Sequence, residues 1–99
     1  MGTTCTSLAE VRDNIDRLDD RIVELLAERG RYVEQAARFK ATKAAVVDND
    51  RIEDIVLKVR HLANEYGTSP DLIEHIYRAM INAYILHESQ EWLKLHEGA

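Results

Sequence analysis

Hydrophobic residues recur along the first third of the chain at alternating steps of three and four positions. The series is Leu8, Val11, Ile15, Leu18, Ile22 and Leu25. This spacing places the six side chains on one face of a helix. Ser7 and Glu10 have the S-x-x-E spacing of a capping box, so the helix is predicted to begin at Ser7. Because the series stays in phase past Gly30, one continuous helix is predicted over residues 7–43. The alternative is a break near Gly30, since glycine costs about 1 kcal/mol in a helix interior.

Two shorter helices are predicted in the rest of the chain. Asp48 or Asp50 is expected to cap the second helix, which Gly67 ends in the position that glycine favours. Ser69 is expected to cap the third helix, with Pro70 in its first turn, and this helix continues almost to the C-terminus. A connector over residues 44–47 joins the first two helices. The predicted helices have about 36, 16 and 27 residues, and no strand-like alternation is present.

The predicted first helix is too long for a compact domain of this size. At 1.5 Å per residue it would span about 54 Å, whereas a compact chain of 99 residues has a diameter of about 33 Å. Its hydrophobic face therefore needs a second chain to cover it, and a homodimer is predicted. Each copy is expected to be all-α, with a single domain over residues 1–99 in which residues 1–6 form a flexible tail.

Several charged residues stand where these helices call for hydrophobic ones. Continued in phase, the first series reaches Arg29 and Lys40, which are expected to share one helix face about 16 Å apart. Glu88 lies on the hydrophobic face of the last helix, Arg51 opens the second helix, and Arg12 flanks the first series. Each charge alone could be a snorkelling or salt-bridged surface side chain. Together their excess of cations predicts a small di-anionic ligand, because buried charge is costly when unpaired.

The positions of two of these arginines give a second argument for a dimer. Arg12 and Arg29 are about 25 Å apart along one helix, which is farther than one small ligand can reach. If both contact the same ligand, Arg12 must come from the other subunit.

Composition narrows the function classes. The formal net charge of −5 disfavours a nucleic-acid-binding protein. No hydrophobic run approaches the roughly 20 residues that span a bilayer, so no membrane contact is predicted and a cytoplasmic location is expected. Cys5 is interpreted as an incidental thiol in a reducing compartment. No metal site is predicted, because the histidines have no metal-ligand spacing such as H-E-x-x-H; they are His61, His75, His87 and His96.

Three segments carry a family resemblance. They are L-A-E-V-R-D-N-I-D-R-L-D-D-R-I-V-E-L-L-A-E-R from Leu8 to Arg29, A-R-F-K from Ala37 to Lys40, and D-N-D-R from Asp48 to Arg51. On these segments the chain resembles the all-helical AroQ-type chorismate mutases over essentially its full length. Within that family it is most similar to the isochorismate-pyruvate lyases, on C-T-x-L-x-E-V-R, R-Y-V-E-Q-A-A-R-F-K-A and a tryptophan near the end.

The resemblance implies an intertwined homodimer with two equivalent sites for chorismate or isochorismate. The implied substrate-binding residues are Arg12, Arg29, Arg51 and Asp48, and the implied catalytic residues are Lys40 and Glu88. Arg29 and the other subunit's Arg12 would bind carboxylates, and Lys40 would donate to the ether oxygen. Arg51 would add positive charge at the mouth, and Asp48 would lie near the substrate ring. The implied activity is the rearrangement of chorismate to prephenate, with stabilisation of negative charge on the breaking ether bond. This implied reaction requires neither a metal nor an organic cofactor.

Two positions depart from the mutase pattern. Glu88 replaces a glutamine, and a carboxylate donates to the ether oxygen only when it is protonated. Burial would raise the pKa of Glu88 and nearby cations would lower it, and the sequence leaves that balance open. Ile52 replaces a glutamate that holds the ring hydroxyl in mutases, which favours the lyase reaction giving salicylate and pyruvate as the first alternative. A non-catalytic helical dimer of the same fold is the second alternative. Whether residues 44–47 act as a lid is open.

Overall fold

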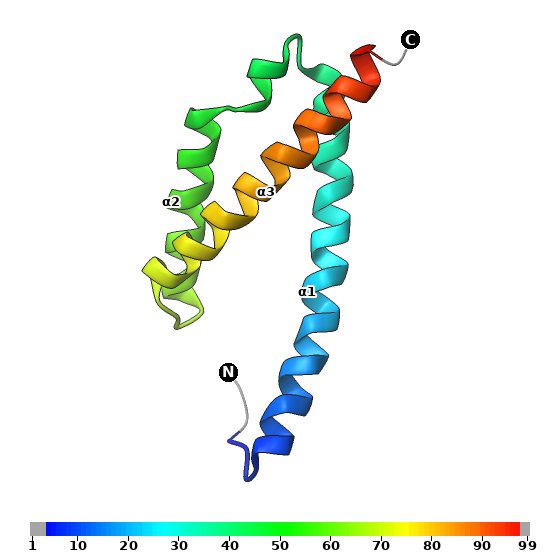
Figure 1. Ribbon diagram of the computed structural model, residues 1–99. Helices are drawn as coiled ribbons and strands as arrows, with labels where there is room; N and C mark the ends of the chain where they lie inside the picture. The colour runs from blue at the N-terminus through cyan, green and yellow to red at the C-terminus, as the bar shows by residue number, and fades with distance from the viewer. Residues whose placement is uncertain (1–3, 98–99) are drawn as a thin grey trace. The chain divides into compact units, whose positions relative to one another are not determined.

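The computed structural model describes residues 4–97 and contains three α-helices (Figure 1). They are α1 (Leu8–Ala36), α2 (Asn49–Glu65) and α3 (Pro70–Glu97), with two 3₁₀ turns, η1 (Ala37–Phe39) and η2 (Lys43–Val46), between the first two. The predicted all-α class and order of three helices are confirmed. The chain divides into two compact units, residues 1–32 and residues 33–99.

Ser7 and Glu10 cap the start of α1 as predicted, except that the Glu10 side chain bonds to Thr6. Ser7 Oγ accepts a hydrogen bond from the backbone N–H of Glu10 at 3.1 Å. The Glu10 carboxylate accepts from the backbone N–H of Thr6 at 3.1 Å and from its hydroxyl at 3.0 Å, not from Ser7. These bonds favour the charged form and lower the pKa of Glu10. Thr6, which was assigned to a flexible tail, therefore belongs to the cap, whereas residues 1–3 lie outside the described part.

The end of α1 corrects the prediction. The helix is continuous through Gly30, as expected, but it stops at Ala36 and passes into η1 instead of continuing to residue 43. Lys40 has φ −89° and ψ 127°, which is extended backbone. The prediction that Arg29 and Lys40 share one helix face is therefore wrong, because Lys40 lies beyond the helix. A tertiary contact accompanies this departure from the helix: the Trp92 indole N–H donates to the Lys40 carbonyl at 3.0 Å.

Side-chain caps define the start of α2 and of α3. The Asp48 carboxylate accepts from the Arg51 backbone N–H at 3.0 Å, so Asp48 rather than Asp50 is the cap of α2. Ser69 Oγ accepts from the Leu72 backbone N–H at 3.2 Å, which caps α3 in the predicted way.

A glycine turn joins α2 to α3. Gly67 has φ 74°, a left-handed conformation that other residues adopt only with strain. Around it, the Thr68 N–H bonds to the Ala63 carbonyl at 2.9 Å and the Gly67 N–H to the Asn64 carbonyl at 3.3 Å. This pair of bonds is a Schellman motif, and it turns the chain so that α3 returns along α2 (Figure 1).

The unit of residues 33–99 has a small hydrophobic core and a charged clamp. Its buried hydrophobic residues are Ala37, Val46, Val56, Val59, Ala63 and Ile81. Glu74 of α3 accepts from Arg60 of α2 and from Arg78 of its own helix, each at 2.7 Å. Arg78 also reaches Glu53 of α2 at 2.9 Å. These arginines lower the pKa of Glu74, with Arg78 the larger influence, so the clamp ties α2 to α3 most firmly when Glu74 is ionised.

The hydrophobic series of α1 is uncovered. No residue of α1 is buried, and the six members of the predicted series are between 38% and 60% exposed. Exposed hydrophobic side chains in one continuous line along a helix are typical of a surface that another chain covers. Within residues 4–97, no helix combines the length and apolar character needed to cross a bilayer.

Candidate functional site

Glu88 is a buried acidic residue on α3. Glu88 is 8% exposed, and among residues 4–96, for which burial is described, no other charged residue is buried. Burial penalises the carboxylate and raises the pKa of Glu88, while the positive charge of Lys40 opposes that rise to a smaller extent. The balance that the sequence left open is therefore settled in favour of burial, and the inward position predicted for Glu88 is confirmed.

One oxygen of Glu88 lacks a partner. Oε1 is buried and has no hydrogen-bond partner among the described residues. A buried polar oxygen without a partner is costly, and protonation lowers that cost because it removes the charge. A protonated Glu88 also acquires an O–H donor, which can serve a group that enters the site.

Lys40 provides the cation next to Glu88. It is half-buried in the extended segment between η1 and η2, and its charge acts on the Glu88 carboxyl. Residues far apart in the sequence are thus brought together within one unit. A lysine and a protonated acid can together donate to an oxygen on which negative charge develops during a reaction.

Arg12 and Arg29 lie in the other unit, on α1. Arg12 is exposed and Arg29 is half-buried. Because α1 is unbroken between them, they are about 25 Å apart along the helix axis. The structure therefore supports the premise of the sequence argument, namely that one small ligand cannot reach both arginines of the same chain.

Asp48 and Arg51 lie at the first turn of α2, and both are exposed. The Asp48 carboxylate already accepts the Arg51 backbone N–H, so the structure gives Asp48 a capping role. The Arg51 guanidinium is at the surface, which suits a charge at the mouth of a site rather than within it.

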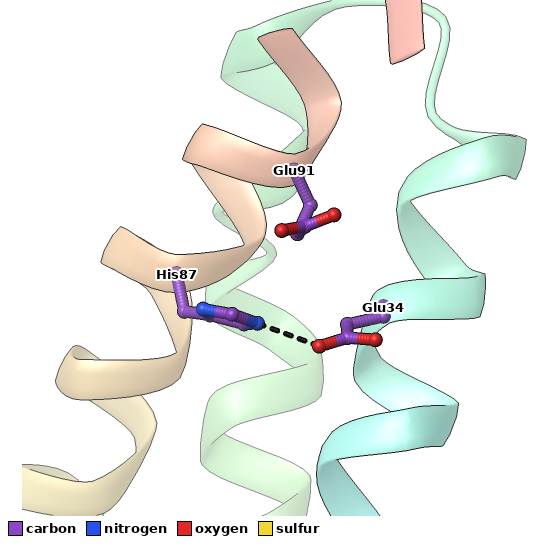
Figure 2. A group of neighbouring side chains, drawn as sticks. All are labelled: Glu34, His87 and Glu91. Carbon is purple, nitrogen blue, oxygen red and sulfur yellow. Dashed lines mark hydrogen bonds and ion pairs between the residues drawn. The ribbon is translucent and has the colours of Figure 1, made fainter. Parts of the chain in front are cut away.

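A group of possible metal ligands lies one residue from Glu88, on α3 and the end of α1 (Figure 2). His87 Nε2 is 2.8 Å from Glu34 Oε1, and the ligand atoms of Glu34, His87 and Glu91 all lie within 4.8 Å of one another. Imidazole and carboxylates are ligands that Zn²⁺ accepts. However, Glu34 is paired with His87, and Glu91 accepts from Lys94 at 3.2 Å, so ion pairs account for the group and we assign no metal to it.

Sequence reasoning missed two contacts in this region. One is the Glu34–His87 pair, and the other is the bond from Trp92 to the Lys40 carbonyl. Both join residues that are distant in sequence, so helical spacing could not reveal them. The sequence feature that could have pointed to Trp92 is its position four residues after Glu88, on the same face of the helix.

Comparison with known proteins supports an enzyme family. Residues 11–89 match the family described as chorismate mutase type II. The chain is 35% identical to the isochorismate pyruvate lyase of Pseudomonas aeruginosa, over 96% of this chain and 94% of that protein. It is 29% identical to the chorismate mutase of Methanocaldococcus jannaschii, over 75% of this chain and 76% of that protein. It is also 31% identical to the T-protein of Haemophilus influenzae, over 85% of this chain but only 22% of that protein.

The matched range extends from the first turn of α1 to the residue after Glu88 and so covers every predicted site residue. The resemblance inferred from the sequence motifs is confirmed. This chain belongs to the chorismate mutase type II family.

Proposed function

We propose that this chain breaks the ether bond of a chorismate-type dianion in a pericyclic reaction. The substrate that we favour is isochorismate, which would give salicylate and pyruvate. Ile52 supports this choice because an aliphatic side chain cannot hold the ring hydroxyl of chorismate, and so does the 35% identity to a lyase over nearly the whole chain. Rearrangement of chorismate to prephenate is the second candidate, since the same ether bond breaks in both reactions.

The observation that carries the proposal is the buried Glu88 beside Lys40. When the ether C–O bond breaks, negative charge develops on the oxygen, and the Lys40 ammonium and protonated Glu88 are donors suited to that atom. Atom balance in the lyase reaction requires a ring hydrogen to move to the methylene carbon of the side chain. No nucleophile is needed for either reaction, so catalysis consists of positioning and charge stabilisation.

Arginines are proposed to hold the two substrate carboxylates. Arg29 would bind one carboxylate, and Arg12 of the partner subunit would bind the other, because the two arginines of one chain are too far apart. Arg51 would add positive charge at the mouth. Asp48 would lie near the substrate ring only if its capping bond to the Arg51 N–H leaves one oxygen available.

A homodimer built on α1 follows from the same reasoning. Covering the exposed half of each side chain in the hydrophobic series would contribute about 1 kcal/mol per residue. Six such residues on each chain provide a continuous surface for a second copy. The two units of each chain would then belong to one domain that is completed by the partner.

Product analysis tests the proposed function. Purified protein is incubated separately with chorismate and with isochorismate, and prephenate, salicylate and pyruvate are quantified by chromatography. Salicylate and pyruvate in equal amounts from isochorismate support the lyase, and prephenate from chorismate supports the mutase. If neither substrate is converted, the non-catalytic dimer is the correct interpretation. Arg29→Ala should remove whichever activity is found, because one carboxylate loses its cation.

A further inference from the structure

The single tryptophan of the chain is bonded to the backbone of Lys40. The Trp92 indole N–H donates to the Lys40 carbonyl at 3.0 Å. The indole ring stacks on His96 with ring centroids 4.2 Å apart and an interplanar angle of 16°. His96 Nδ1 in turn lies 2.9 Å from the Trp92 carbonyl. The indole ring face thus lies on a residue of its own helix, and its polar atom is directed at the backbone of Lys40.

Lys40 has little else in its backbone to fix it. Its N–H bonds to the Ala37 carbonyl at 3.4 Å, which is long for such a bond. The residues that follow, Ala41 and Thr42, are exposed and non-helical. The indole bond therefore fixes the peptide unit from which the Lys40 side chain extends.

The indole and the buried acid lie on the same face of α3. Trp92 follows Glu88 by four residues, which is about one turn. One face of α3 therefore supplies the acid and, one turn later, the group that anchors the neighbouring cation.

We propose that Trp92 is a positioning residue, whose indole N–H fixes the Lys40 carbonyl and so holds the Lys40 ammonium against Glu88 and the reacting ether oxygen. The catalytic part of this proposal rests on the proposed function. The effect of Trp92 on the Lys40–Glu88 pair is independent of that function. The substitution that isolates the N–H is Trp92→Phe, which keeps an aromatic ring and removes the donor.

The direction in which Glu88 titrates distinguishes positioning from simple packing. Lys40 lowers the pKa of Glu88 and burial raises it. Releasing Lys40 removes a cation and moves the Glu88 titration to higher pH, whereas opening the core to water would move it to lower pH. Other titratable groups near this stretch are Glu34 and His87, which contact each other at 2.8 Å, and Glu91, which pairs with Lys94 at 3.2 Å. Trp92→Phe removes none of these groups.

The experiment is an NMR titration of the full-length protein with carbon-13 in the glutamate side-chain carboxyls, in which Glu88→Gln identifies the Glu88 signal. In Trp92→Phe the Glu88 signal should titrate at higher pH than in wild type. On the proposed substrates kcat should fall about 10- to 100-fold, as expected for a displaced catalytic group, and KM should change less. The matched control is His96→Leu, which removes the stacked ring but keeps the indole N–H, and which should behave as wild type in both measurements.

Three results would overturn the proposal: an unchanged Glu88 titration in Trp92→Phe, a shift to lower pH, or the same changes in His96→Leu. If the wild type converts neither substrate, the proposed function fails, and the titration still decides whether Trp92 holds Lys40 against Glu88. Should Trp92→Phe not fold, hydrogen exchange of the one indole N–H in wild type tests the contact on which the proposal depends. Slow exchange is expected for a bonded donor, and exchange at the rate of a free indole would refute the contact.

Discussion

Replacing Glu88 with Gln is expected to remove a loss of activity that the wild type undergoes as pH rises. Burial raises the pKa of Glu88 more than Lys40 lowers it. If protonated Glu88 donates to the ether oxygen, kcat is constant below its pKa and falls about tenfold per pH unit above it. Gln keeps an N–H donor at all these pH values, so the variant should have a flat profile over the same range.

The same substitution should change how stability depends on pH. Because the pKa of Glu88 is higher in the folded than in the unfolded chain, the folded state binds more protons between the two pKa values. The free energy of unfolding is therefore highest below the unfolded-state pKa and decreases through this window, by at most about 1.4 kcal/mol per pH unit. Gln does not titrate, so this slope should disappear.

The assay is a series of kcat determinations and urea denaturation curves across pH for wild type, Glu88→Gln and Asp54→Asn. Asp54 is an exposed carboxylate of α2, so its variant controls for the loss of one negative charge and should follow the wild type. A pH–rate curve in Glu88→Gln that keeps the wild-type fall would remove Glu88 from the mechanism. A stability slope that remains would show that another group is responsible.

Three further predictions concern the fold and the assembly. Gly67→Ala should lower the free energy of unfolding by about 1 kcal/mol, because alanine is strained at a φ of 74°. No atom lies within 4 Å of an added Cβ, so steric overlap adds nothing to this cost; an unchanged urea midpoint would contradict the prediction. Glu74→Gln should destabilise the protein at neutral pH, and the difference from wild type should vanish in urea curves as pH falls through the lowered pKa of Glu74; a difference that persists in acid would exclude the clamp. Leu18→Glu should yield monomers in sedimentation velocity experiments while Ala27→Glu, on the opposite face of α1, leaves the dimer intact; equal behaviour of the two variants would argue against the hydrophobic series as the interface.

Helix starts could be predicted from the sequence because their causes are local. Ser7 and Ser69 each cap the helix that the sequence assigned to them, and Gly67 turns the chain after α2 in the left-handed conformation expected for glycine at that position. Such caps depend on residues three or four positions apart, so spacing alone is informative.

The end of α1 could not be predicted in this way. Residues 37–43 contain no proline or glycine, so the sequence offered no local reason to stop the helix. Just beyond the stop, the Lys40 carbonyl accepts a hydrogen bond from the indole of Trp92, which is 52 residues farther along the chain. A local pattern does not contain that contact.

The candidate site was predicted in part for the same reason. Glu88 was expected to face inward because its neighbours one turn away on α3 are hydrophobic, and it does. The direction of its pKa shift needed the extent of burial to be weighed against the charge of Lys40, and both depend on tertiary packing. Arg12 and Arg29 were singled out by their phase and spacing, and their place in a shared site stays a prediction.

The most direct test of a site shared between two copies is a subunit-mixing assay with Arg12→Ala and Arg29→Ala. Each variant alone should be inactive, since every site lacks one arginine. When the two are mixed in equal amounts and allowed to exchange subunits, about half of the dimers are mixed, and each mixed dimer has one site with both arginines intact. The account predicts that the mixture regains about a quarter of wild-type activity, whereas a mixture that stays inactive after subunit exchange has been verified would contradict it.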